Sequence, residues 1–333
     1  MILSVTDLSV RFATDGGVVR AVEGVSFDLD RGEILAIVGE SGSGKSVTAQ
    51  TILGLTRAPN ATITGSVEFD GRDLTQLDDE QLREVRGKRI AMIFQDPMTS
   101  LNPVYRVGDQ IVEMIRAHRK VSKAEARDRA VELLRSVGIP NPERRVRDYP
   151  HEFSGGMRQR VMIAMALSLD PDVLIADEPT TALDVTVQAQ ILRLLARLNS
   201  ERGLAVVLIT HDLGVVAEVA DRVAVMYAGQ IVEEASLDEL FYDPQHPYTW
   251  GLLGSLPRLD QPNPERLAQI AGAPPSLADL PAGCRFAPRC PHVFDKCAEP
   301  PPLHRDRCWL SAEQKRTLRV VDGRIGLRKP VTT

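Results

Sequence analysis

The stretch Gly39-Glu40-Ser41-Gly42-Ser43-Gly44-Lys45-Ser46 decides the fold class of this chain. It fits the pattern GxxxxGK[ST] at every fixed position, and it follows an apolar run and precedes a predicted helix. Glycines in such a loop let successive backbone N–H groups point at phosphate oxygens, and the helix N-terminus adds positive potential. The stretch therefore predicts a phosphate-binding loop, in which Lys45 reaches the β and γ phosphates and Ser46 binds Mg²⁺.

A pair of acids supports the same chemistry. The apolar run 173–176 ends in Asp177-Glu178, at the carboxyl end of a predicted buried strand, where ligands of open α/β sheets gather. We expect Asp177 to hold Mg²⁺ through water and Glu178 to act on the attacking water. Because many plain strands also end in acids, this pair is informative only together with the phosphate loop.

The composition is that of an ordinary globular protein of about two domains. The chain has 333 residues, of which 43% are hydrophobic and 26% charged, so a sizeable core is expected. Its net charge of −5 gives no general attraction to nucleic acid, which we do not expect as a partner. The apolar runs are far shorter than the ~18 residues of a membrane span, and the first residues lack a signal-peptide pattern. We therefore expect the chain to stay in the cytosol.

The order of predicted elements indicates an α/β fold that is interrupted by a helical insertion. Strand-like runs occur at 2–5, 9–12, 25–29, 34–38, 65–69 and 89–94. Helical patterns dominate about 101–169, where Ser122 and Glu125 form a capping pattern. Strand-like runs return, with helices between them, at 173–176, 205–209 and 223–226, which predicts a mostly parallel sheet. Prolines then predict an extended linker at 257–283, between a first domain at 1–256 and a small module at 284–333.

The segment Phe153-Ser154-Gly155-Gly156-Met157 precedes a predicted helix and forms a second candidate phosphate-binding helix end. Taken in chain order with the phosphate loop, Gln95, the acidic pair and His211, it resembles the motif series of the ATP-binding cassette (ABC) family. The resemblance implies an α/β nucleotide-binding domain of the P-loop NTPase class. Such a domain has a mixed sheet core, an N-terminal antiparallel β subdomain and a helical subdomain, to which this chain adds a small cysteine-ligated C-terminal extension.

The resemblance also implies roles for individual residues. Glu178, His211 and Gln95 would be catalytic, and Gln95 and Ser46 would contact Mg²⁺. The positions that it assigns to ATP binding are Gly39, Ser41, Gly42, Ser43, Gly44, Lys45, Ser46, Val47, Asp177, Phe12, Ser154, Gly155, Gly156 and Asp184. Phe12 would stack on adenine, although a Phe after a strand is more often a core residue. Since the signature of one chain closes over ATP held by another, Met157 in place of the usual glutamine would alter the partner's site.

Three longer stretches narrow the resemblance to importer ATPases for dipeptides and oligopeptides: QDPMTSLNP at 95–103, YPHEFSGGMRQRVMIAMAL at 149–167 and HPYTWGLL at 246–253. FSGGM is similar to the D-type subunit. This implies a heterodimer with an F-type ATPase, two transmembrane permease subunits and an extracytoplasmic peptide-binding protein, with this chain at the cytoplasmic face of the cell membrane. An importer of nickel or another small solute, a soluble ABC ATPase acting on DNA or ribosomes, and a binding-only subunit remain alternatives.

All four cysteines lie within 25 residues, at Cys284, Cys290, Cys297 and Cys308. A chain in the cytosol rarely forms structural disulfides, so metal ligation is the leading interpretation. The closely spaced CxxC pairs that are typical of zinc do not occur, and four thiolates suit zinc or a [4Fe–4S] cluster equally by ligand type. The resemblance to peptide importers favours the [4Fe–4S] cluster, with zinc and unligated thiols as alternatives. Its expected role is to fold the small module.

Overall fold

The computed structural model describes residues 1–95, 100–181, 183–256 and 270–321. The chain divides into two compact units, and each is described by itself. Unit 1 comprises Met1–Ile2, Leu29–Ile34 and Gln76–Ile209, and unit 2 comprises Leu3–Asp28, Leu35–Thr75 and Thr210–Thr333. None of the helices in the described ranges has the length and apolar character that crossing a membrane requires.

Unit 1 contains three parallel strands and most of the helices. The strands are β6 (Ile90–Ile93), β7 (Val173–Asp177) and β8 (Ala205–Thr210), and β7 pairs with both of the others. Every residue of β7 and β8 is buried, which explains why these strands are continuous apolar runs and do not alternate. The carboxyl end of β7 thereby holds the acidic pair at the edge of a packed sheet.

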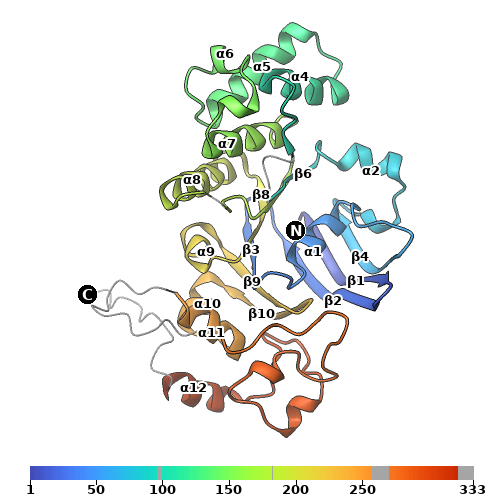
Figure 1. Cartoon of the computed structure of the whole chain (residues 1–333), viewed down its shortest axis with the longest axis vertical. Coiled ribbons are helices and arrows are strands. Elements are labelled where there is room, and N and C mark those ends of the chain that lie inside the picture. Colours follow the sequence, from blue (N-terminus) through green and yellow to red (C-terminus); the bar gives the residue numbers. More distant parts are fainter. Residues whose placement is uncertain (96–99, 182, 257–269, 322–333) are drawn as a thin grey trace, which may run out of the picture. The chain divides into compact units, whose positions relative to one another are not determined.

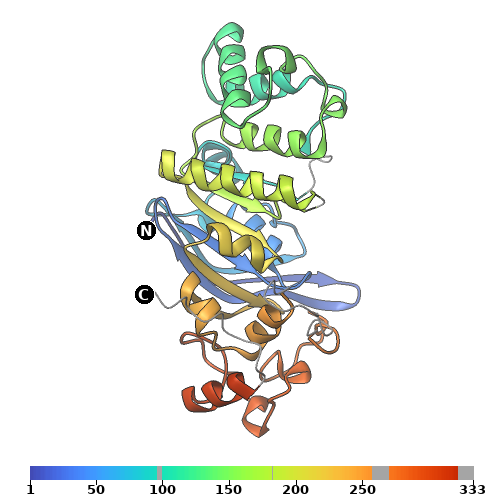
Figure 2. The same cartoon turned by 90° about the vertical axis from the view of Figure 1, so that its left-hand side faces the viewer.

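Helices fill the rest of unit 1: α2 (Asp79–Val85), α4 (Val107–His118), α5 (Lys123–Ser136), α6 (Pro142–Arg145), α7 (Gly155–Ala166) and α8 (Val185–Arg202). Helices α4, α5 and α7 pack against one another at one end of the unit (Figure 1, Figure 2). The predicted cap of α5 is confirmed, since Ser122 and Glu125 exchange hydrogen bonds with each other's backbone N–H groups. This end is the helical part of the fold.

Unit 2 holds an antiparallel sheet in the order β2-β1-β4-β5, formed by Gly17–Leu29, Leu3–Thr14, Ala61–Phe69 and Arg72–Asp73. The sequence predicted short pieces at 2–5 and 9–12, whereas the structure has one long strand β1. A bulge explains the difference, because the register against β4 shifts between Thr6 and Ser9 and Asp7 has a φ of 49°. The shift breaks the alternation of apolar residues from which strands are predicted.

The remaining strands of unit 2 carry the phosphate loop. β3 (Ile34–Val38) runs parallel to β9 (Arg222–Tyr227), which pairs antiparallel with β10 (Gln230–Ser236). The helices of this unit are α1 (Lys45–Ile52), α9 (Leu213–Val219), α10 (Leu237–Tyr242), α11 (Pro247–Gly254) and α12 (Ala312–Val321). Parallel and antiparallel pairs together give the mixed architecture that the family resemblance implied.

The described part of the C-terminal segment, 270–321, belongs to unit 2 and packs on its strands (Figure 1). The Arg307 N–H donates to the Val232 carbonyl at 2.7 Å, and Asp306 forms an isolated antiparallel bridge with Glu233 of β10. The Arg20 N–H on β2 donates to the Leu277 carbonyl at 2.9 Å. Of the predicted linker, 257–269 lies outside the described residues, as does 322–333 of the predicted module.

Candidate functional site

The phosphate loop leaves β3 and enters α1 through backbone that requires glycine. Gly39 has a φ of 156°, and an added Cβ there would lie 2.0 Å from the Met226 carbonyl oxygen. Gly44 has a φ of 102°, and its Cβ would lie 2.4 Å from the Ala21 carbonyl oxygen. No side chain caps the start of α1 at Gly44. A helix N-terminus of this kind is typical of anion-binding sites.

The Lys45 ammonium lies over this loop. Its Nζ donates to the carbonyl oxygens of Gly39 at 2.8 Å and Glu40 at 2.9 Å, and lies 3.4 Å from Ser43 Oγ. The residue is only 4% exposed, so its charge acts in a setting that screens it weakly. The other predicted loop residues, Ser41, Gly42, Ser46 and Val47, share this loop and the first turn of α1.

The acidic pair of unit 1 has a fixed geometry at the end of β7. Asp177 is 3% exposed, and Glu178 has a φ of 46°, a strained value for a residue with a side chain. Glu178 Oε2 accepts hydrogen bonds from Gln95 Nε2 at 2.9 Å and from Thr181 Oγ1 at 2.8 Å. Two of the three predicted catalytic residues, Gln95 and Glu178, are therefore in direct contact. Because both bonds converge on Oε2, they set the direction of the carboxylate.

The signature segment lies at the start of α7. Ser154 caps this helix, with its Oγ accepting from the Met157 N–H at 3.4 Å. An added Cβ at Gly156 would lie 2.4 Å from Val187 Cγ1 on α8, so glycine there lets two helices approach closely. Asp184 caps α8 by accepting from the Val187 N–H at 3.0 Å. The local structure thus gives Ser154, Gly156 and Asp184 defined packing or capping roles.

Phe12 and His211, the other predicted site residues, both belong to unit 2. Phe12 lies half-buried on β1, opposite Ala61 of β4. His211 is exposed directly after β8 and belongs to unit 2, whereas Glu178 belongs to unit 1. Residues 96–99 of the QDPMTSLNP stretch lie outside the described residues.

The four cysteines of unit 2 line one small, largely apolar cavity. Other side chains around it include His246, Phe286, His292, Phe294, Trp309 and Leu310. The Cys284 N–H donates to the Cys297 carbonyl at 2.9 Å, and burial raises the pKa of the Cys290 thiol to about 11 and of Cys308 to about 12. Within the described ranges, no three His, Cys, Asp or Glu side chains are arranged to hold a metal ion.

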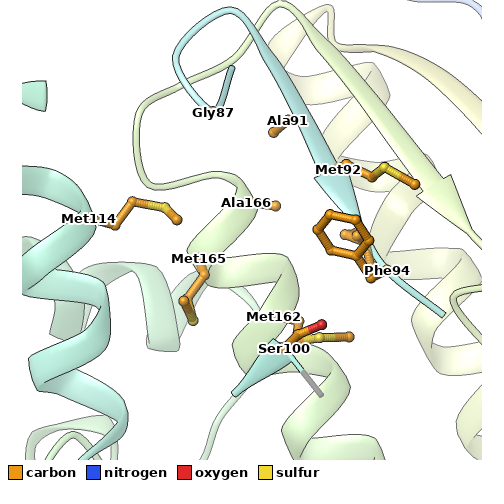
Figure 3. A pocket seen from close by; sticks show the side chains of 10 residues that line it. Gly87, Ala91, Met92, Phe94, Ser100, Met114, Met162, Met165 and Ala166 are labelled. Atoms are coloured by element: carbon orange, nitrogen blue, oxygen red, sulfur yellow. The ribbon is translucent and has the colours of Figure 1, made fainter. Parts of the chain in front are cut away.

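A methionine-rich groove of about 400 Å³ lies in unit 1 (Figure 3). It is lined by β6 and the segment after it, by α4 and by α7, through the side chains of Met92, Phe94, Met114, Met162 and Met165. Phe94 is 41% exposed within it. Flexible, polarisable methionines adapt to an apolar partner, which makes the groove a candidate contact surface.

Two contacts on the phosphate loop were missed by the sequence analysis. Tyr248 Oη accepts a hydrogen bond from the Glu40 N–H at 2.9 Å, and Arg289 pairs with the Glu40 carboxylate. The sequence drew attention to Tyr248 only as part of the stretch HPYTWGLL, and it gave no reason to single out Arg289. Residues 208 and 249 positions away from Glu40 leave no local pattern that would connect them with it.

Comparisons with known proteins show what this chain is similar to. Residues 22–181 match the family described as ABC transporter, and residues 232–297 match the oligopeptide/dipeptide transporter, C-terminal region. The chain is 57% identical over 317 residues to the oligopeptide transport ATP-binding protein OppD of Bacillus subtilis, covering 93% of this chain and 88% of that one. It is 54% identical over 321 residues to the dipeptide transport ATP-binding protein DppD of the same organism, covering 94% and 96%. The dimeric cassette MJ0796, a bacterial ABC transporter cassette, superimposes with a TM-score of 0.64 at 30% identity, over 71% of this chain and 99% of that one.

Proposed function

This chain belongs to the ABC transporter family, and we propose that it is the ATPase subunit of an importer that takes up oligopeptides or dipeptides. The observation that carries the proposal is the identity above 50% with peptide-transport ATP-binding proteins over more than nine-tenths of the chain. The match of residues 232–297 to the oligopeptide/dipeptide transporter C-terminal region supports the same substrate class.

The residues suit ATP hydrolysis. The glycine loop and Lys45 would hold the β and γ phosphates, because N–H groups and a buried ammonium favour an anion there. Ser46 and Gln95 would offer Mg²⁺ the oxygen ligands that it prefers, Asp177 would hold the ion through water, and the ion when bound would neutralise phosphate charge. Glu178, held by Gln95 and Thr181, would orient and polarise the attacking water. His211 would contact the γ-phosphate, and Phe12 would stack on adenine.

In the assembly we place this chain at the cytoplasmic face of the membrane, paired with an F-type ATPase. Two permeases would change conformation when the two ATPases close and open, and an extracytoplasmic peptide-binding protein would deliver the substrate. Ser154, Gly155, Gly156 and Asp184 would close over the ATP held by the partner ATPase, where the Met157 side chain offers no hydrogen-bond donor. The methionine-rich groove of unit 1 offers an apolar seat for a permease segment.

We propose that the four cysteines hold a [4Fe–4S] cluster, on the strength of the family resemblance and of their common cavity. Four soft sulfur donors line one small, apolar cavity, which is the ligand type that iron–sulfur clusters use. Bound iron would stabilise the thiolates and hold the segment together, a structural contribution. Zinc, whose four sulfurs would have to approach within about 3.8 Å of one another at Zn–S bonds of ~2.3 Å, is the alternative.

Transport in membrane vesicles tests the proposed function. Vesicles that contain this chain with its copurified permeases should accumulate a labelled oligopeptide when ATP is supplied, and an assembly with Glu178→Gln should not. Glu201→Gln, at an exposed acid on α8, is the matched control and should transport normally. Uptake of nickel without peptide would contradict the substrate class and leave the ATPase assignment standing.

A further inference from the structure

Glu40, the second residue of the phosphate loop, forms an ion pair with Arg289, which lies outside the loop. The guanidinium makes two parallel hydrogen bonds to the carboxylate, from one terminal nitrogen to Oε2 at 2.6 Å and from the other to Oε1 at 3.0 Å. A bidentate arginine–carboxylate pair of this kind is both strong and directional. Glu40 is therefore fixed in orientation as well as in position.

The Arg289 side chain is also fixed by contacts other than the one with Glu40. Its side chain is only 4% exposed, and its Nε donates to the Ala271 carbonyl at 2.9 Å. The guanidinium lies 5.8 Å from the ring centroid of Tyr227, a cation–π distance. Arg289 also directly precedes Cys290, so the fold of the cysteine segment sets where this side chain starts.

The backbone N–H and carbonyl groups of Glu40 connect the Arg289–Glu40 ion pair with the rest of the phosphate loop. The Glu40 N–H donates to the hydroxyl of Tyr248, a side chain with no exposure that packs against Tyr227 and Phe286. The Glu40 carbonyl accepts from Lys45 Nζ at 2.9 Å. A continuous chain of contacts thus runs from Arg289 through Glu40 to the lysine that would meet the phosphates.

We propose that Arg289 is a positioning residue for ATP: by fixing Glu40 it holds the phosphate loop and Lys45 in the arrangement that binds the triphosphate. The proposal rests on the proposed ATP binding by this loop. A guanidinium fork satisfies both carboxylate oxygens at once, which neither lysine nor glutamine can do. The competing role, anchoring of the C-terminal segment without effect on the nucleotide, predicts lower stability but unchanged affinity.

Calorimetric titration of the full-length chain with a non-hydrolysable ATP analogue separates the two roles. Arg289→Gln and Glu40→Gln should each weaken the analogue about tenfold, which corresponds to about 1.4 kcal/mol. The double variant should bind no more weakly than either single variant, because both remove one interaction. Arg289→Lys keeps the charge, so its affinity for the analogue should lie between the affinities of the wild type and of Arg289→Gln.

Arg319→Gln is the matched control, since Arg319 pairs with Asp243 at 2.6 Å from the same C-terminal segment without touching the loop. It should lower the melting temperature while leaving the affinity unchanged. Wild-type affinity in a folded Arg289→Gln chain, or an equal loss in Arg319→Gln, would overturn the inference. If Arg289→Gln does not fold, Glu40→Gln and Arg289→Lys decide by the same criterion. Wild-type chain that fails to bind, or Lys45→Ala that binds equally well, would instead refute the proposed ATP site.

Discussion

Neighbouring glycines of the signature should respond in opposite ways to the same substitution. In Gly156→Ala the new Cβ would lie 2.4 Å from Val187 Cγ1, more than 1 Å closer than ordinary contact. Val187 is β-branched and lies in the first turn of α8, so it yields little, and overpacking of this kind costs about 1–3 kcal/mol. The gain in helix propensity offsets at most about 1 kcal/mol. We therefore expect a net loss of about 1–2 kcal/mol in the free energy of unfolding.

Gly155→Ala is the matched comparison. Its Cβ would lie 3.5 Å from Leu183 Cδ2, an ordinary contact, so only the propensity gain remains. This variant should be as stable as the wild type or about 0.5 kcal/mol more stable. Urea unfolding followed by circular dichroism compares the three midpoints, provided that the slopes agree. An undiminished midpoint in Gly156→Ala, or equal losses in both variants, would refute the packing argument for this segment.

Three further predictions concern catalysis, the cysteines and pH. Glu178→Gln should reduce ATP turnover in the assembled transporter at least about 100-fold while leaving nucleotide bound, as measured by phosphate release and by occupancy; near-normal turnover would exclude Glu178 as the water-polarising group. Chain purified anaerobically should contain about four irons, and Cys290→Ser should lose them. A content of one zinc per chain would instead show that the cysteines bind zinc and not the cluster. Burial raises the pKa of Glu233 to about 7, above its unfolded value, so its contribution to stability should be full below pH 4.5 and decline by about 3 kcal/mol as pH rises from about 4.5 through 7. Glu233→Gln should lack this decline in thermal melts; parallel pH profiles of variant and wild type would contradict the assignment.

The sequence predicted best what is encoded locally. The phosphate loop was predictable because its glycines are required by backbone geometry, as at Gly39 and Gly44, and that requirement is written at fixed spacing. β7 and β8 were predicted to within a residue because burial on both faces leaves an uninterrupted apolar run. β1 was predicted in fragments, because the bulge at Asp7 changes which face each side chain occupies.

Contacts between distant parts of the sequence were not predictable in this way. Gln95 and Glu178 were placed in one site by family resemblance, and the hydrogen bond between their side chains is a fact of the fold alone. Nothing near Arg289 in the sequence distinguishes it from the other arginines of the C-terminal segment. Arg289 meets Glu40 because of the packing of Tyr227, Tyr248 and Phe286, whose ring centroids lie 4.6 to 5.4 Å apart.

The HPY stretch then acquires a physical role. His246 caps α11 by accepting the Tyr248 backbone N–H at its Nδ1, and Glu233 Oε2 on β10 accepts the His246 backbone N–H at 2.8 Å. These bonds hold Tyr248 where its hydroxyl meets the Glu40 N–H of the phosphate loop. Tyr248 and Arg289 both lie in the region matched by the oligopeptide/dipeptide transporter C-terminal family. The part of the chain that matches the peptide-transporter C-terminal family therefore contacts the phosphate loop directly, through two different groups of Glu40.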